Sequence, residues 1–235
     1  MISIIVPTYN EAENIKKLVP MVASALSGDN YEILVVDDSS PDGTAKVSEK
    51  LAEKYPVRVI KRSSKLGLAS AILEGFKHAC GDVLGVIDAD LQHPPMYMKE
   101  FIKAIYEGYD IVIGSRYVEG GKIEGWNKER ILISKGAILL TRPLIFGVKD
   151  PISGYFFLKK SVIEGVKFNP TGYKFSLELL VKGNYKKIKE VPYTFKMRKI
   201  GESKLDSGEI YKYLHLIGHL YKYRFSQILR SLKSR

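Results

Sequence analysis

The sequence contains very little cysteine and no long apolar run. Cys80 is the only cysteine among the 235 residues, so no disulfide can form within the chain and no thiolate cluster can hold zinc. The most apolar stretch, residues 131–148, contains Lys135, Arg142 and Pro143 and falls short of the roughly 20 apolar residues that a membrane span requires. The first residues lack the charged flank, apolar segment and cleavage site of a signal peptide. These absences predict a protein of the reducing, cytoplasmic side of the cell that does not cross a bilayer.

Repeats and low-complexity segments are also missing, whereas positive charge is in excess. The length suits one large α/β domain with its own core, and the 20 glycines and 10 prolines are near average usage. Lysine and arginine number 37 against 26 acidic residues, which gives a net charge of +11. This charge predicts attraction to a polyanion, and by itself it fits nucleic acid, anionic lipid or a phosphorylated substrate.

Short β-branched runs alternate with helical patterns over the first half of the chain. Strands are predicted at residues 2–6, 32–36, 57–60, 82–87 and 110–114, and helices at residues 12–25, 41–55, 68–79 and 94–106. Asn10 is the expected N-cap of the first helix. The succession predicts a mostly parallel sheet with helices on both faces.

The regular alternation of strands and helices ends after the fifth predicted strand. An amphipathic helix is predicted at residues 127–140 and a strand at residues 154–158, so the sheet is expected to become mixed. Further on, apolar and polar residues alternate as in a strand with one buried face, and Arg198 falls on the opposite face. The residues expected on the buried face are Val191, Tyr193, Phe195 and Met197.

The last segment is predicted to be a basic amphipathic helix. Its apolar residues recur at a helical period, at Ile210, Leu214, Ile217, Tyr221, Phe225, Ile228 and Leu232. Basic residues lie between them, and no acid follows Glu209. Such a helix suits an anionic membrane surface or a partner helix, and packing on its own domain is the alternative.

Acidic side chains stand where several predicted strands end. Glu11 follows the first strand, Asp37 and Asp38 end the second, and Asp88 and Asp90 end the fourth. The carboxyl ends of parallel strands meet at one edge, where open α/β folds bind ligands, so these acids are expected to cluster. Taken alone, an Asp-X-Asp pair is more often a strand end and a helix cap. A cluster of acids is costly without a cation, and its oxygen donors suit Mg²⁺ or Mn²⁺ bound to a diphosphate.

Several motifs carry a resemblance to a known family. They are residues 7–11 (Pro-Thr-Tyr-Asn-Glu), 36–44, 88–95 (Asp-Ala-Asp-Leu-Gln-His-Pro-Pro), 114–117 and 150–154. Over residues 2 to about 204 the chain resembles family 2 glycosyltransferases, and most closely the polyprenol (dolichol) phosphate mannose synthases. The resemblance implies an α/β fold of the GT-A type, which binds nucleotide sugars. Residues 1–206 would form the catalytic domain and residues 207–235 a membrane- or partner-facing amphipathic helix.

The resemblance also implies roles for individual residues. Those expected to hold the nucleotide sugar are Pro7, Tyr9, Glu11, Val36, Asp38, Asp88, Ala89, Asp90, Arg116, Arg198 and Lys204. Asp90 and Gln92 would bind the metal, Mg²⁺ or Mn²⁺. The residues expected to act in catalysis are Asp90, Arg116, Arg198 and Lys204, and the three cations among them would meet the acceptor phosphate and the donor's diphosphate, as suits arginine and lysine. An acceptor phosphate is already ionised at neutral pH, so no catalytic base is assigned.

The implied reaction is transfer of mannose, with inversion, from GDP-mannose to dolichol or polyprenol phosphate, giving polyprenyl phosphate mannose and GDP. A polyprenol phosphate glucosyltransferase that uses UDP-glucose is the nearest alternative. A nucleic-acid-binding module is more distant, because no nucleic-acid motif is present and the sheet edge is acidic. A catalytically silent scaffold is also more distant, because the acidic and basic positions are intact. The chain is expected to lie peripherally on the cytoplasmic side of a membrane, through residues 126–146 and the last helix, or to use a small membrane subunit.

Overall fold

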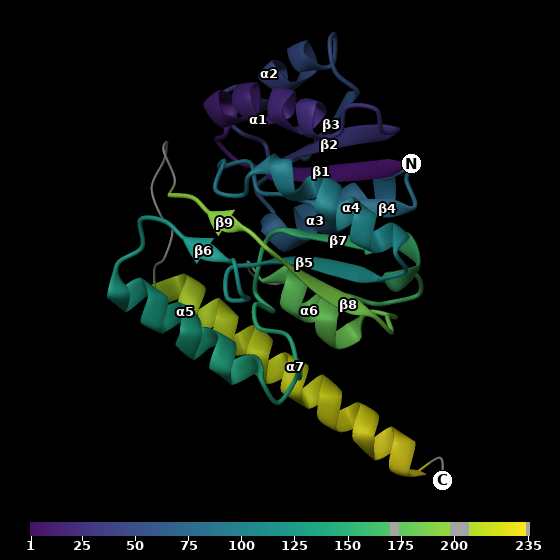
Figure 1. Cartoon of the computed structure of the whole chain (residues 1–235), viewed down its shortest axis with the longest axis vertical. Helices are drawn as coiled ribbons and strands as arrows, with labels where there is room; N and C mark the ends of the chain where they lie inside the picture. Colours follow the sequence, from purple (N-terminus) through teal and green to yellow (C-terminus); the bar gives the residue numbers. More distant parts are fainter. Residues whose placement is uncertain (170–173, 198–206, 234–235) are drawn as a thin grey trace.

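The computed structural model describes residues 1–169, 174–197 and 207–233, and a seven-stranded sheet is its main feature (Figure 1). The strands of this sheet are β1 (Ile2–Thr8), β2 (Tyr31–Asp37), β3 (Val57–Lys61), β4 (Val83–Val86), β5 (Ile111–Ser115), β7 (Phe156–Lys159) and β8 (Ile188–Pro192). Their order is β3-β2-β1-β4-β7-β5-β8; β7 is antiparallel to both neighbours and the other pairs are parallel. A short parallel ribbon pairs β6 (Lys122–Ile123) with β9 (Thr194–Phe195). The prediction of a mostly parallel, mixed sheet is confirmed.

Helices cover both faces of the sheet. One face packs against α1 (Ala12–Ala25), α2 (Thr44–Leu51) and α4 (Met98–Tyr106), which follows the short 3₁₀ turn η1 (Pro95–Tyr97). The other face packs against α3 (Leu68–His78) and α6 (Phe175–Lys182), and a second 3₁₀ turn, η2 (Lys160–Val162), follows β7. Two more helices, α5 (Lys128–Thr141) and α7 (Ser207–Lys233), run side by side at one end of the sheet, and α7 extends beyond the body of the molecule (Figure 1).

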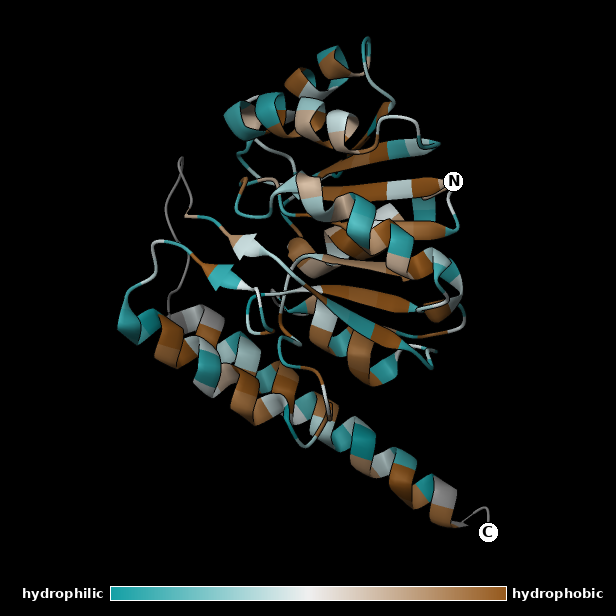
Figure 2. Cartoon of the chain, in the orientation of Figure 1, coloured by the Kyte–Doolittle hydropathy of each residue, from teal (hydrophilic) through white to brown (hydrophobic). Residues whose placement is uncertain are grey.

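Strand β1 shows how the sequence divides between the two faces. Ile2, Ile4 and Val6 join the core cluster that includes α1 and α4, whereas Ile5 joins the cluster that includes α3. Successive strand residues point to opposite faces, so a continuous apolar run is what a strand buried on both sides requires. Figure 2 shows this as largely hydrophobic central strands beneath helices of mixed character.

Backbone geometry changes the predicted N-cap of one helix and the predicted start of another. The bounds of α1 match the prediction, but Asn10 has φ 59° and the N-cap position belongs to Glu11. The side chain of Asp42 caps α1 from the neighbouring loop by accepting a hydrogen bond from the backbone N–H of Ala12 at 3.0 Å. The predicted helix from residue 41 begins later, at the start of α2, because Gly43 takes the left-handed conformation with φ 85°.

Burial of apolar residues differs from the prediction in three places. Met197 is 61% exposed, although Val191, Tyr193 and Phe195 are buried as predicted. In α7 the predicted apolar stripe is mostly exposed, and the residues buried against the body are Leu216, Ile217 and Leu220. The amphipathic pattern predicted for α5 is also wrong, because its buried face combines Ser134, Ile138 and Thr141 while Leu132 and Leu139 are exposed. Among the described residues, no helix combines the length and apolar character needed to cross a membrane.

Candidate active site

A cleft of about 670 Å³ lies at the carboxyl ends of β1, β4 and β5 and continues between α5 and α7. Its polar part is lined by Pro7, Thr8, Tyr9, Glu11, Asp38, Lys65, Asp88, Ala89, Asp90, Gln92, His93, Arg116 and Lys174, among others. Its apolar part is lined mainly by Ile133, Ala137 and Leu140 of α5 and by Ile210, Leu214 and Leu216 of α7. One continuous hollow thus joins a charged sheet edge to an apolar groove between two helices.

The Asp38 carboxylate organises the loop that borders the polar part. It forms a nearly buried ion pair with Arg62, and it accepts hydrogen bonds from the backbone N–H groups of Leu66 at 3.2 Å and Gly67 at 2.7 Å. This loop places the Lys65 Nζ 3.8 Å from the centre of the Tyr9 ring. Asp38 therefore shapes the site by holding the loop as well as by lining the cleft.

The segment from Asp88 to Gln92 carries side-chain oxygens that could bind a cation. The Asp90 carboxylate accepts a hydrogen bond from the backbone N–H of Gln92 at 3.1 Å, and the Gln92 side-chain nitrogen donates to the carbonyl oxygen of Lys196 at 3.1 Å. This second bond orients the amide, so its carbonyl oxygen is the end that can bind a cation. Among the described residues, no three or more His, Cys, Asp or Glu side chains are grouped to hold a metal. The arrangement fits Mg²⁺ or Mn²⁺ that takes its remaining ligands from diphosphate and water.

A buried ion pair holds the side chain of Arg116 next to this segment. Arg116 donates from Nε and Nη2 to the two carboxylate oxygens of Asp150, both at 2.7 Å, and its backbone N–H donates to the same carboxylate at 3.0 Å. Burial alone would lower the pKa of Arg116, but the Asp150 charge and hydrogen bonds outweigh it and raise that pKa above its ordinary value. Arg116 is therefore a permanently charged group with a fixed orientation in the cleft.

A second arginine lies near the first. The Arg116 guanidinium is 5.5 Å and the Arg130 guanidinium 4.4 Å from the centre of the Trp126 ring. All three residues line the cleft, and neither Trp126 Nε1 nor Arg130 Nε has a hydrogen-bond partner among the described residues, although both atoms are buried. Buried donors beside two cations are what an anionic group requires.

His93 is buried at the floor of the cleft. Its side chain packs among the rings of Tyr155, Tyr193 and Phe195, at centroid distances of 5.4, 5.7 and 5.3 Å. Burial, reinforced by the positive charges of Arg116 and Lys174, lowers the pKa of His93 to about 3. The imidazole is therefore neutral at physiological pH.

Comparison with known proteins supplies the family. The model described as glycosyl transferase family 2 matches residues 3–166. The chain belongs to this family. A dolichol-phosphate mannosyltransferase of Pyrococcus furiosus is 53% identical over 225 residues, which are 94% of this chain and 64% of that protein. One of Mycosarcoma maydis is 39% identical over 238 residues, 96% of this chain and 81% of that protein. The chain thus spans a little under two thirds of the length of the first relative, and the resemblance seen in the motifs is confirmed.

Solved structures of other glycosyltransferases share the fold of this family 2 member. A glucosyl-3-phosphoglycerate synthase of Mycobacterium tuberculosis, in complex with Mn²⁺, UDP and glucosyl-3-phosphoglycerate, superposes with a TM-score of 0.70 at 20% identity over 95% of this chain and 79% of that chain. A complex of the same enzyme with Mg²⁺ and UDP gives 0.68 at 21% identity over 93% and 79%. The predicted GT-A type fold is therefore confirmed.

The structure brings together most of the residues predicted from the sequence. The cleft is lined by Pro7, Tyr9, Glu11, Asp38, Asp88, Ala89, Asp90, Gln92 and Arg116. The Val36 side chain is not among those lining it, because this residue is fully buried in the core beneath α3. Arg198 and Lys204 lie outside the described residues, and the predicted boundary at residue 206 falls in the same stretch.

Several residues of the cleft were not predicted. Lys65, Trp126, Arg130 and Lys174 line it, and Asp150 holds Arg116 in place. Asp150 belongs to the motif at residues 150–154, for which the sequence predicts no role. For the others, a lone lysine, arginine or tryptophan carries no spacing signal, and only the fold places it at the cleft.

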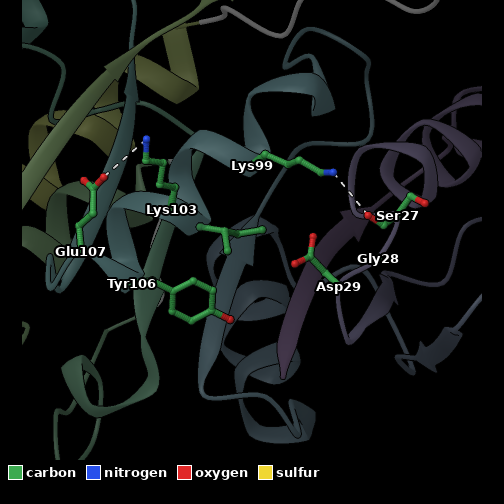
Figure 3. Close-up of a pocket in the computed structure, with 8 residues that line it drawn as sticks. Ser27, Gly28, Asp29, Lys99, Lys103, Tyr106 and Glu107 are labelled. Atoms are coloured by element: carbon green, nitrogen blue, oxygen red, sulfur yellow. Dashed lines mark hydrogen bonds and ion pairs between the residues drawn. The ribbon is translucent and has the colours of Figure 1, made fainter.

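A second and more open hollow, of about 570 Å³, lies at the amino end of β2 (Figure 3). Figure 3 shows it between the turn after α1, with Ser27, and the side chains of α4. There the Lys99 Nζ donates to the carbonyl oxygen of Ser27 at 3.4 Å, and the Lys103 Nζ lies 3.9 Å from Oε1 of Glu107. None of the predicted site residues lines this hollow, so the candidate chemistry belongs to the first cleft.

Proposed function

We propose that this chain transfers mannose from GDP-mannose to the phosphate of dolichol or another polyprenol, giving polyprenyl phosphate mannose and GDP. The observation that carries the proposal is the single cleft with two parts. Its acidic and basic part suits a nucleotide diphosphate sugar and a metal, and its apolar part between α5 and α7 suits the first units of an isoprenoid chain. The relatives named dolichol-phosphate mannosyltransferase support the same choice of substrates.

The acceptor phosphate is placed by the proposal at Arg116 and Arg130. These cations stand where β5 ends and α5 begins, between the two parts of the cleft, and the buried Trp126 and Arg130 donors lie beside them. Ser134, which also lines the cleft, is one turn further along α5. A phosphate held here would have its lipid tail directed along α5 and α7.

The proposed chemistry is a single displacement at the anomeric carbon. A phosphate oxygen of the acceptor forms the new bond while the bond to the GDP diphosphate breaks, so the configuration inverts. The chain's cations reduce the repulsion between the two anions and orient the acceptor, and no general base is required because the phosphate is already ionised. A divalent ion held by Asp90 and Gln92 would supply charge to the departing diphosphate. Arg198 and Lys204 are proposed as further phosphate-binding cations.

The donor is tested by following labelled sugar into a lipid-extractable product. With dolichol phosphate and Mg²⁺ or Mn²⁺, we expect transfer from GDP-mannose at least about 100-fold faster than transfer from UDP-glucose, because a site shaped for one base leaves polar groups unpaired with another. Faster transfer from UDP-glucose would reassign the donor. No transfer of either sugar, in detergent and in vesicles, by protein that binds GDP would contradict the proposal.

The proposal also places α5 and α7 against an anionic membrane surface. Their exposed apolar side chains, together with the loop after α5, are Leu132, Ile133, Leu139, Leu140, Phe146, Ile210, Tyr211, Leu214, Tyr221, Phe225, Ile228, Leu229 and Leu232. Figure 2 shows hydrophobic residues recurring along both helices outside the sheet. Basic residues such as Lys222, Arg224 and Arg230 are interspersed with them, as in helices that lie in the headgroup region.

Membrane docking is tested with a variant that carries both Phe225→Glu and Leu232→Glu. These side chains are 63% and 64% exposed, and burying one such group in lipid is worth about 1.5–3 kcal/mol, so binding to phosphatidylserine vesicles should weaken at least about 10-fold. The matched control is Tyr106→Glu, because Tyr106 is 67% exposed on α4. Equal vesicle binding by the double variant and the control, measured by co-sedimentation, would refute this placement.

A further inference from the structure

One buried polar atom of the cleft is not explained by the proposed chemistry. The His93 side chain is only 4% exposed, and its Nδ1 has no hydrogen-bond partner among the described residues. The nearest acidic atom is Oδ2 of Asp88, at 3.6 Å. This separation is too long for a hydrogen bond, but a shift of less than about 1 Å would make one.

The surroundings decide which of the two side chains can move. The imidazole is held among Tyr155, Tyr193 and Phe195, so the ring cannot turn without displacing three aromatic side chains. The Asp88 carboxylate is 29% exposed and lines the open cleft. Closing the gap therefore requires a rotation of the carboxylate alone.

Gly154 leaves the room that the Asp88 carboxylate occupies beside His93. A Cβ atom at this position would lie 2.8 Å from Oδ2 of Asp88 and 3.6 Å from Cε1 of His93. Any larger residue would force the carboxylate to leave this position. The absence of a side chain at position 154 thus belongs to the same arrangement.

The tautomer of the ring follows from the same geometry. A neutral imidazole carries one proton, and the other nitrogen presents a lone pair. A lone pair on Nδ1 would face a carboxylate oxygen and repel it, whereas an N–H there would attract it. A buried N–H is unfavourable unless it finds an acceptor, and Asp88 is the acceptor within reach.

We propose that His93 is a positioning residue whose Nδ1–H donates to Asp88 and aims that carboxylate at the ribose and diphosphate of the nucleotide sugar. The inference rests on the proposed function for the identity of the donor. Hydrogen bonds within active sites often tighten when substrate binds, so the contact is expected to shorten in the complex with the nucleotide sugar.

Three substitutions at His93 separate positioning from simple packing. The side-chain nitrogen of Asn is bonded to Cγ, as Nδ1 of His93 is, so it can donate from nearly the same place. The side-chain nitrogen of Gln lies one atom further from the backbone. Phe keeps an aromatic ring but has no hydrogen-bond donor. We expect His93→Asn to retain transfer within about 3-fold of wild type. His93→Gln and His93→Phe should lose at least about 10-fold in kcat/KM for the donor, mainly through KM. A packing role predicts the reverse order, with Phe retained best, and that order would overturn the proposal.

A double-mutant cycle tests whether His93 acts through Asp88. If it does, His93→Phe combined with Asp88→Asn should lose no more than Asp88→Asn alone, because the interaction is already absent. If the fold-loss of the combined variant equals the product of the fold-losses of the two single variants, the residues act independently and the coupling is refuted. Thermal unfolding of every variant identifies any loss that comes from misfolding.

Measurements that do not depend on transfer separate this inference from the proposed function. In NMR spectra of wild-type protein with ¹⁵N-labelled histidine, His93 Nδ1 should have the chemical shift of a protonated nitrogen. The signal of His93 is identified because it is absent from the spectrum of His93→Phe. Calorimetry with GDP and with UDP, in the presence of Mn²⁺, measures nucleotide affinity. For whichever nucleotide binds, the affinity of His93→Asn should exceed that of His93→Gln and of His93→Phe. Unprotonated Nδ1 would refute the positioning role, while a wild type that binds nucleotide but transfers no mannose would refute the proposed function alone.

Discussion

Replacing Asp90 with Asn is expected to reduce mannosyl transfer by on the order of 10³-fold, because the change removes the charged oxygen ligand proposed for the metal. The neutral amide keeps the shape of the side chain and can still accept from the backbone N–H of Gln92, so the segment should stay folded. The measurement is kcat with GDP-mannose and dolichol phosphate over a range of Mn²⁺ concentrations. Higher Mn²⁺ should restore part of the activity, since the Gln92 oxygen and the diphosphate still bind the ion weakly.

The matched control for this variant is Asp82→Asn. Asp82 precedes β4, its side chain is 92% exposed, and it is not among the residues that line the cleft. Its loss should leave transfer and metal dependence unchanged. A second readout is the rise in unfolding temperature when GDP and Mn²⁺ are added together, which should be present in wild type and the control and much smaller in Asp90→Asn. Full activity in Asp90→Asn would contradict the assignment of Asp90 as a metal ligand.

Replacing Asp150 with Ala is expected to destabilise the fold by about 3–5 kcal/mol, because it leaves the Arg116 charge buried without its partner. The side chains of Arg116 and Asp150 are 6% and 0% exposed, so water cannot take the place of the lost carboxylate. Transfer should fall as well, since the guanidinium loses the two hydrogen bonds that orient it. Urea unfolding measures the stability, and steady-state kinetics on the fraction that remains folded measures the transfer.

Two comparisons separate stability from function at this pair. The double variant Arg116→Met with Asp150→Leu removes both charges, and it should recover much of the lost stability without recovering transfer. Glu107→Ala breaks the more exposed pair with Lys189, whose side chains are 42% and 39% exposed, and it should cost less than about 1 kcal/mol. A loss below about 1 kcal/mol in Asp150→Ala would show that the buried pair does not hold Arg116.

Local patterns predicted most of the secondary structure because the periodicity of apolar residues is a property of the sequence itself. The bounds of α1 agree with the prediction, and β1 and β2 differ from it by only one or two residues at their ends. The errors concern conformations that the pattern does not specify. The left-handed backbone of Asn10 moved the N-cap of α1 to Glu11, and that of Gly43 moved the start of α2. The contacts made in the folded chain decided the exposure of Met197 and of the α7 stripe.

Part of the candidate site could also be predicted from the sequence. Residues that follow parallel strands must meet at one edge, so Glu11, Asp38 and Asp90 could be grouped from the sequence. The motif resemblance contributed Gln92 and Arg116, which also line the cleft. Lys65, Trp126 and Arg130 could not be found in this way, because they reach the cleft from a loop and from the region of α5.

By itself, the sequence determined the elements, the acidic edge and the family, because each of these depends on residues that are close in the chain or on a motif. The tertiary structure alone decided which distant residues touch. Strand β7 enters the sheet between β4 and β5 and is antiparallel to both, so its amino end lies at the same edge as their carboxyl ends. The loop before β7 therefore carries Asp150 to Arg116 and Gly154 to Asp88. No spacing in the sequence states this, since strand order depends on how whole elements pack and not on the residues between them.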